Sequence, residues 1–319
     1  MQITLAELRS AARLVHGIMP PTPQHKWPLL DARVAADVWV KHENHAPTGA
    51  FKVRGGMVYV DRLAKSDQRV DGVVTATRGN HGQSVGLAAR RGGIKALVVV
   101  PHGNAREKND AMRALDVELI EAGDDFQAAV EEADRIAAAR EWHRLPSFHP
   151  WLVAGVGTWA LELFEAVADV ETLYVPIGLG SGISGAIAAR DALGLSTRIV
   201  GVVSSGAPAY ARSIASGTLE SHPVTTLLAD GMACRTPVPE ALEIIARGAD
   251  RIVEVTDEEV ASAMRVLFTD THNVAEGAGA AATAALLQER DNQRGRRVAV
   301  VISGGNVDAD VYGKVLTGR

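Results

Sequence analysis

Short runs of apolar, mostly β-branched residues alternate along this chain with longer stretches of helical periodicity. Several of the short runs lack strict apolar–polar alternation, which is typical of parallel strands covered on both faces. Strands that alternate with helices predict an α/β fold built on parallel sheets. The expected strands lie at 38–41, 72–76, 96–100, 118–121, 173–177, 199–203, 252–255 and 298–302, and the clearest helices at 82–91, 125–140, 158–168, 256–269 and 279–288.

Two breaks in this pattern indicate how the chain divides into domains. Pro146 and Pro150 interrupt it near 145–150, and an initial segment ends near Thr48. We therefore expect a small domain at 50–146, inserted into a large domain formed by 1–49 and 147–319. A cleft between two such domains is a common place for a ligand.

Composition narrows the class of protein. The chain has 319 residues, 47% of them hydrophobic, which is enough for two domains with their own cores. A net charge of -5 argues against a nucleic-acid partner. Cys234 is the single cysteine, so no intrachain disulfide can form. No apolar run approaches the roughly 20 residues that span a bilayer. Thr4 and Glu7 match a helix capping box, and no signal-peptide core follows. We expect a cytoplasmic protein.

Lys52 is the first candidate for chemistry. It follows a predicted strand, with Phe51 before it and Gly55 and Gly56 shortly after it, whereas a surface lysine usually has charged neighbours. This setting predicts an amine in a crowded site, where burial lowers the pKa and makes the amine a nucleophile for carbonyls. Lys52 is therefore a candidate Schiff-base lysine. An ordinary lysine that opens a helix is the alternative.

Three loops follow predicted strands, where open α/β sheets bind ligands. The loop at 77–81 runs into a helix, and its N–H groups suit a carboxylate, although Asn80 could simply cap that helix. The glycine-rich loop at 178–182 also opens a helix and predicts a phosphate site. The third loop, at 302–306, follows the last predicted strand, and the Ser303 hydroxyl in it could bind a ligand heteroatom.

The second loop also matches a dinucleotide fingerprint. Gly180, Gly182 and Gly185 satisfy G-x-G-x-x-G, which further requires an acid at the end of the next strand. That strand ends in Ser204 and Ser205 instead. The dinucleotide interpretation is therefore the weaker of the two.

The lysine segment and the three loops, in this order and spacing, resemble the fold-type II pyridoxal-phosphate (PLP) enzymes, in particular the threonine/serine dehydratase and serine racemase branch. The likeness extends from Thr22-Pro23 to Asn306, nearly the whole chain. It implies a tryptophan synthase β-like fold: two open parallel-sheet α/β domains with pyridoxal 5'-phosphate in the cleft. It also implies a homodimer.

The resemblance implies a role for each matching residue. Lys52 would carry the cofactor as a Schiff base and act as the catalytic base. The other cofactor contacts would come from Phe51, Asn80, Gly178, Leu179, Gly180, Ser181, Gly182, Glu276 and Ser303, and the substrate carboxylate would be held by Thr77, Arg78, Gly79, Asn80 and His81.

The implied reaction is an α,β-elimination. It converts a 3-hydroxy amino acid, such as L-threonine or L-serine, to a 2-oxo acid and ammonia. The resemblance places Ser303 at the pyridine nitrogen of the cofactor. A serine hydroxyl cannot hold a proton on that nitrogen as a carboxylate would, which favours prompt loss of the β-hydroxyl.

The chain departs from the family pattern in several places. Leu179 and Ser181 replace two of four glycines in the phosphate loop. Arg78 stands where racemases carry an acid/base serine, and an arginine cannot exchange a proton near neutral pH, so racemisation is disfavoured. Arg78 could instead bind a second carboxylate, so the same-class alternative is a dehydratase of 3-hydroxyaspartate or of another unusual 3-substituted amino acid, with Arg78 in specificity. An arginine that faces solvent or pairs with a local acid is the alternative.

Other residues are expected to play no part in catalysis. The segment 201–205 lacks the carboxylate with which metal-binding relatives hold Mg²⁺ or Mn²⁺, so no metal is expected. Asp230 is an isolated acid expected to cap a turn or line the entrance. His45, His149 and His272 are expected in packing or surface positions, and feedback control through a regulatory domain after residue 319 is not expected. A dehydratase is the leading hypothesis, and a nucleotide-binding oxidoreductase is the alternative from a different class.

Overall fold

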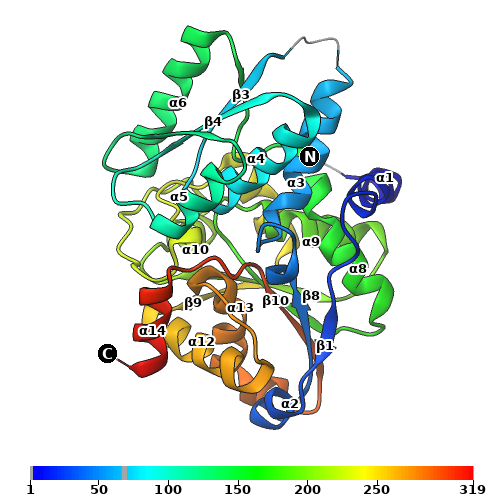
Figure 1. The fold of residues 1–319 in the computed structure, drawn as a ribbon. Coiled ribbons are helices and arrows are strands. Elements are labelled where there is room, and N and C mark those ends of the chain that lie inside the picture. The colour runs from blue at the N-terminus through cyan, green and yellow to red at the C-terminus, as the bar shows by residue number, and fades with distance from the viewer. Residues whose placement is uncertain (1–2, 67–69, 319) are drawn as a thin grey trace.

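The computed structural model describes residues 3–66 and 70–318 and contains two open sheets (Figure 1). The larger sheet has the order β1-β2-β10-β7-β8-β9 and is parallel except for β1, and the smaller one has the order β5-β4-β3-β6 and is parallel throughout. The strands are β1 (Gln24–Lys26), β2 (Asp37–His42), β3 (Gly72–Ala76), β4 (Lys95–Val100), β5 (Glu118–Glu121), β6 (His143–Arg144), β7 (Thr172–Pro176), β8 (Arg198–Ser204), β9 (Arg251–Val255) and β10 (Arg297–Ile302).

Helices cover both sheets and connect their strands. The α-helices are α1 (Leu5–His16), α2 (Pro28–Val34), α3 (Lys52–Ala64), α4 (Asn80–Gly92), α5 (Arg106–Arg113), α6 (Phe126–Arg140), α7 (Pro150–Val156), α8 (Thr158–Ala166), α9 (Ser181–Ala192), α10 (Ala209–Ser216), α11 (Pro239–Gly248), α12 (Asp257–Thr271), α13 (Gly277–Gln288) and α14 (Ala309–Thr317), with short 3-10 turns η1 (Glu43–His45), η2 (Asp230–Met232) and η3 (Arg290–Gln293).

Each sheet is buried on both faces, as the continuous apolar runs predict. Leu173 and Val175 of β7 join the hydrophobic cluster on one face of the larger sheet, whereas Tyr174 between them joins the cluster on the other. In the smaller sheet, Val73 and Val74 of β3 divide between two clusters in the same way. The period-two geometry of a strand therefore supplies both cores from one uninterrupted apolar run.

The predicted fold class is confirmed, and all eight predicted strands are present within one residue at each end. β1 and β6 were missed because they are short and polar, with three and two residues. The predicted capping box is present, since Thr4 Oγ1 accepts a hydrogen bond from the Glu7 N–H at 3.2 Å. The smaller sheet uses only strands between 72 and 144. The exact domain limits near 50 and 146 stay a prediction. In the described parts of the chain, no helix has both the length and the apolar character needed to cross a membrane.

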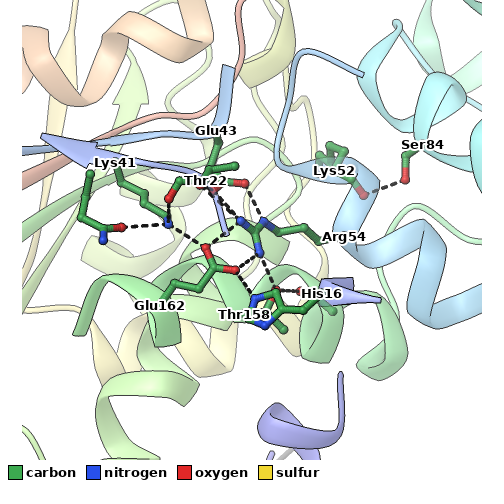
Figure 2. A network of polar contacts seen from close by, with 11 residues as sticks. His16, Thr22, Lys41, Glu43, Lys52, Arg54, Ser84, Thr158 and Glu162 are labelled. Carbon is green, nitrogen blue, oxygen red and sulfur yellow. Dashed lines mark hydrogen bonds and ion pairs between the residues drawn. The ribbon is translucent and has the colours of Figure 1, made fainter. Parts of the chain in front are cut away.

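A buried network of charges joins the start of α3 to the larger sheet and to α8. The Arg54 side chain has no exposed surface, and its guanidinium contacts Glu43 at 2.7 Å and Glu162 at 2.6 Å (Figure 2). Lys41, also without exposed surface, donates to Glu162 at 2.6 Å. His16 Nε2 lies 2.8 Å from the same carboxylate. The network holds two arginine or lysine cations against two carboxylates, so each buried charge is compensated.

We predict that Arg54→Met destabilises the protein by about 3–5 kcal/mol, because it leaves Glu43 and Glu162 buried without their main cation. The measurement is the free energy of unfolding from denaturant titration. Arg135→Met is the matched control, because Arg135 pairs with Glu132 on the exposed face of α6. The control should leave the unfolding curve nearly unchanged. Similar losses in both variants would contradict the prediction.

Candidate active site

Lys52 is positioned by a backbone pairing between two distant segments. The Phe51 N–H donates to the Ser303 carbonyl at 3.1 Å, and the Gly305 N–H donates to the Gly49 carbonyl at 2.9 Å. Ala50 and Gly304 form an antiparallel bridge between these bonds. The first residue of α3 is therefore fixed at the carboxyl end of β10, at the edge where parallel sheets bind ligands.

The Lys52 amine is enclosed by protein, although the residue retains some exposure to the cleft. Its Nζ donates to Ser181 Oγ at 3.0 Å. Burial lowers the pKa of Lys52 to about 8, and the negative charge of Glu276 opposes that shift. Ser84 Oγ donates to the Lys52 carbonyl at 2.6 Å and fixes the backbone behind the side chain (Figure 2). The expectation of an amine in a crowded site is confirmed, and near neutral pH this amine has an accessible neutral form.

The loop that follows β7 faces this amine. Gly180 adopts φ +95°, and a Cβ there would lie 2.7 Å from Ala241 Cβ, so only glycine fits this position without strain. α9 begins at Ser181 without a side-chain cap. Among the described residues, no loop or cap hydrogen bond uses a backbone N–H between 178 and 183. This turn therefore presents free donors and the positive end of a helix dipole to an anion.

The loop that follows β3 supplies a second set of donors. The Thr77 N–H already donates to the Val99 carbonyl at 3.0 Å, and the Gly79 N–H to Thr77 Oγ1 at 2.9 Å. Of the five predicted carboxylate-binding residues, Arg78, Asn80 and His81 therefore keep N–H groups outside the loop's own hydrogen bonds. Burial, with a smaller effect of the Lys52 charge, lowers the pKa of His81 to about 3, so its ring is neutral.

Asn80 connects this loop to the other side of the cleft. Its Nδ2 donates to Glu276 Oε1 at 2.6 Å, and its Oδ1 accepts from Asn306 Nδ2 at 2.9 Å. Gly79, not Asn80, caps α4, and no side chain caps that helix, so the interpretation of Asn80 as a cap is wrong. An amide nitrogen carries two hydrogens, so one remains for a ligand. Ser303 Oγ, also buried, makes a long hydrogen bond of 3.4 Å to the Ala278 carbonyl.

Lys108 is a site residue that the sequence did not reveal. Its side chain extends from α5 past Gly79, and its Nζ lies 2.7 Å from Asp230 and 3.1 Å from Glu276. Burial by itself lowers the pKa of Lys108, but the two carboxylates outweigh it and the pKa is raised, so this lysine stays charged. Burial also raises the pKa of Glu276, against the influence of Lys108. Asp230 is therefore paired, and its description as an isolated acid is wrong.

One cavity collects all fourteen predicted site residues, from both sheets. They are Phe51, Lys52, Thr77, Arg78, Gly79, Asn80, His81, Gly178, Leu179, Gly180, Ser181, Gly182, Glu276 and Ser303. The cavity is also lined by residues that the sequence did not single out for this site, among them Lys108, Phe126, Ser147, Met232 and Cys234. The roles proposed for the individual residues stay predictions.

The cavity has the features that a phosphorylated aldehyde requires. A lysine with a lowered pKa can bond to a carbonyl. The glycine turn beside it offers N–H donors to an anion. Ser181 of that turn lies within hydrogen-bonding distance of the Lys52 amine. Fold and site together define a two-sheet α/β protein with a lysine of lowered pKa beside a glycine-rich turn that opens a helix.

The comparison with known families gives this class a name. Residues 16–304 match the family described as "Pyridoxal-phosphate dependent enzyme". The chain belongs to this family, and its cofactor is pyridoxal 5'-phosphate.

Individual relatives cover nearly the whole chain. It is 34% identical to the L-threonine ammonia-lyase of Thermotoga maritima over 98% of this chain and 78% of that protein. It is 32% identical to the catabolic L-threonine dehydratase TdcB of Escherichia coli over 97% of this chain and 94% of that protein. The structure of maize serine racemase superposes with a TM-score of 0.92 at 27% identity, over 100% of this chain and 98% of that one.

We predict that Gly180→Ala weakens cofactor binding by at least about tenfold, because the left-handed backbone and the contact with Ala241 both oppose a Cβ. The measurement is a titration of the apoprotein with the cofactor, followed by its visible absorbance. Gly313→Ala in α14 is the control, because its Cβ would meet open space. Equal affinity in both variants would contradict a phosphate site in this turn.

We predict that the Lys52 amine of the apoprotein titrates near pH 8. Folding favours the neutral amine, so this group's contribution to stability rises with pH from about 8 to the ordinary value of 10.5. Pulsed acylation at a series of pH values, read by mass spectrometry of the peptide that contains Lys52, gives the titration. Glu276→Gln should move the midpoint lower, because Glu276 favours the charged amine. A Lys52 midpoint above pH 10 in the unsubstituted apoprotein would contradict the prediction.

Proposed function

We propose that this protein is a PLP-dependent ammonia-lyase that dehydrates 3-hydroxy amino acids, with L-threonine or L-serine as default substrates. The observation that carries the proposal is a lysine with a pKa lowered to about 8, held 3.0 Å from the phosphate-binding turn and facing free N–H groups of the loop at 77–81. Similarity to the L-threonine ammonia-lyase and the L-threonine dehydratase supports it.

Each part of the cavity is assigned one binding task. Lys52 would bond to the cofactor aldehyde, and the turn at 178–182 would hold its phosphate. Ser303 would face the ring nitrogen, and the remaining Asn80 hydrogen would reach the phenolic oxygen. Phe51, whose ring lies 3.4 Å from the place where a Cβ on Gly182 would stand, would pack beside the ring. When bound, the cofactor supplies an electron sink for the Cα carbon of the amino acid.

The protein's own residues then position the substrate and move protons. The N–H groups of Arg78, Asn80 and His81 hold the α-carboxylate, which leaves the Cα hydrogen for the Lys52 amine to remove. General base catalysis of this kind contributes about 10²- to 10⁴-fold. The β-hydroxyl leaves with a proton as water, and the resulting enamine tautomerises and takes up one water to give a 2-oxo acid and ammonia. Threonine thus becomes 2-oxobutanoate and ammonia, with no net change in water.

Two other activities fit the cavity less well. Racemisation requires an acid/base group on the second face of Cα, and Arg78 occupies the position of the family's serine. A nucleotide-binding oxidoreductase would use the turn at Gly180, but β8 ends in Ser204 without an acid for a ribose. We propose in addition that the enzyme is a homodimer that acts in the cytoplasm. The family resemblance supports the dimer, and the unpaired buried Cys234 is compatible with a reducing compartment.

Lys52→Ala should abolish both the visible absorbance of the bound cofactor and the release of 2-oxo acid from threonine, with a rate loss of at least about 10²- to 10⁴-fold. Borohydride reduction of the native holoenzyme should add the cofactor mass to the peptide that contains Lys52. Lys65→Ala, an exposed lysine at the end of α3, serves as the control and should change neither result. Cofactor mass on another lysine, or a coloured and active Lys52→Ala protein, would overturn the assignment.

A further inference from the structure

The Arg78 side chain is charged, lines the active-site cavity and has no protein partner. Among the described residues its guanidinium forms neither a hydrogen bond nor an ion pair, and its Nε atom is buried without an acceptor. The expected alternatives, an arginine paired with a local acid or turned fully to solvent, are therefore not what the structure shows. A buried donor of a charged group without a partner is costly, so such a group usually has a ligand to bind.

The acids that share the cavity with Arg78 are already paired. Asp230 and Glu276 both contact Lys108, at 2.7 and 3.1 Å. Among the described residues, both carboxylates contact Lys108, and neither forms an ion pair or a hydrogen bond with Arg78. The Arg78 guanidinium therefore lines this part of the cavity without a direct partner.

Arg78 also lies at the junction between the inner cavity and a wider outer groove, because it lines both. Phe126, Leu179 and Ala233 line the same junction. Apolar neighbours of this kind lower the local polarity and strengthen a charge-assisted hydrogen bond to an entering anion. The backbone N–H of Arg78 belongs to the α-carboxylate loop, so its side chain is available for a second acidic group of the same substrate.

We propose that Arg78 binds a second carboxylate, and that the preferred substrate is a 3-hydroxy amino acid with an acidic side chain, of the 3-hydroxyaspartate type. This inference rests on the proposed dehydratase function and specifies its substrate. The planar guanidinium matches a carboxylate with two parallel N–H···O bonds. The reaction proposed for threonine, in which one water is lost, one water is taken up and ammonia is released, would convert such a substrate to a 2-oxo diacid.

The decisive experiment compares substrates on the holoenzyme and on two variants. Arg78→Met keeps an apolar stem of similar length and removes the charge. Arg78→Lys keeps the charge but removes the planar guanidinium with its paired N–H donors. We expect Arg78→Met to lower kcat/KM for one 3-hydroxyaspartate diastereomer by about 10- to 100-fold more than it lowers kcat/KM for threonine. The kcat/KM of Arg78→Lys for 3-hydroxyaspartate should lie between the values of the native enzyme and of Arg78→Met. Arg235→Met is the control, because Arg235 lines only the outer groove, pairs with Asp125 at 3.5 Å and should affect neither substrate.

A binding measurement separates this inference from the dehydratase assignment. Succinate should bind the native holoenzyme at least about tenfold more tightly than butyrate by calorimetry, and Arg78→Met should remove the difference. Equal losses on threonine and 3-hydroxyaspartate, no preference for succinate, or a weakened cofactor affinity in Arg78→Met would each overturn the inference. If the native enzyme releases 2-oxo acid from none of these substrates, the proposed function is wrong, and the succinate comparison alone decides whether Arg78 binds a second acid.

Discussion

The ion pairs of Arg54 with Glu43 and Glu162 set the position from which the site is built. Charges without solvent contact are tolerated only when their partners are held at close range, so this network permits one placement of the start of α3. Lys52 lies two residues earlier, about 200° around the same helix. The buried arginine therefore directs the lysine away from the network and into the cavity. The bridge between Ala50 and Gly304 fixes the same segment from its other end.

Two lysines in one cavity have been given opposite properties by their surroundings. The pKa of Lys52 is lowered because burial outweighs a single carboxylate, whereas the pKa of Lys108 is raised because Asp230 and Glu276 together outweigh burial. Groups whose pKa values are pushed apart are suited to different tasks. A lysine with an accessible neutral form can bond to an aldehyde and accept a proton. A lysine that stays charged can only fix the carboxylates around it, and through Glu276 it also orients Asn80.

The sequence predicted the parts of this structure that have a local signal. Buried parallel strands are continuous apolar runs, and ligand loops follow them, so the strands and the three loops could be located. Lys108 could not be predicted, because it lies in a polar helix without a motif and acquires its role only where α5 meets residues more than 100 positions away. The pairing of Asp230 and the missing partner of Arg78 depend on the same tertiary contact.

α5 determines how the two halves of the site face each other. Asp308, just after β10, accepts hydrogen bonds at 3.1 Å from the N–H groups of Arg106 and Glu107 at the start of α5, and Glu107 accepts from the N–H of Ala309 at the start of α14 at 2.9 Å. Asp308 thus accepts from the start of α5, which contains Glu107, and Glu107 accepts from the start of α14, which follows Asp308. The next residue, Lys108, enters the cavity. Because the loop at 77–81 follows a strand of the smaller sheet and the turn at 178–182 follows a strand of the larger one, this reciprocal contact links the two sides of the cavity. α5 carries only one of the residues lining the inner cavity, Lys108, yet it links the two sides of that cavity, so a change at the capping acids of α5 and α14 would act on the site from outside it.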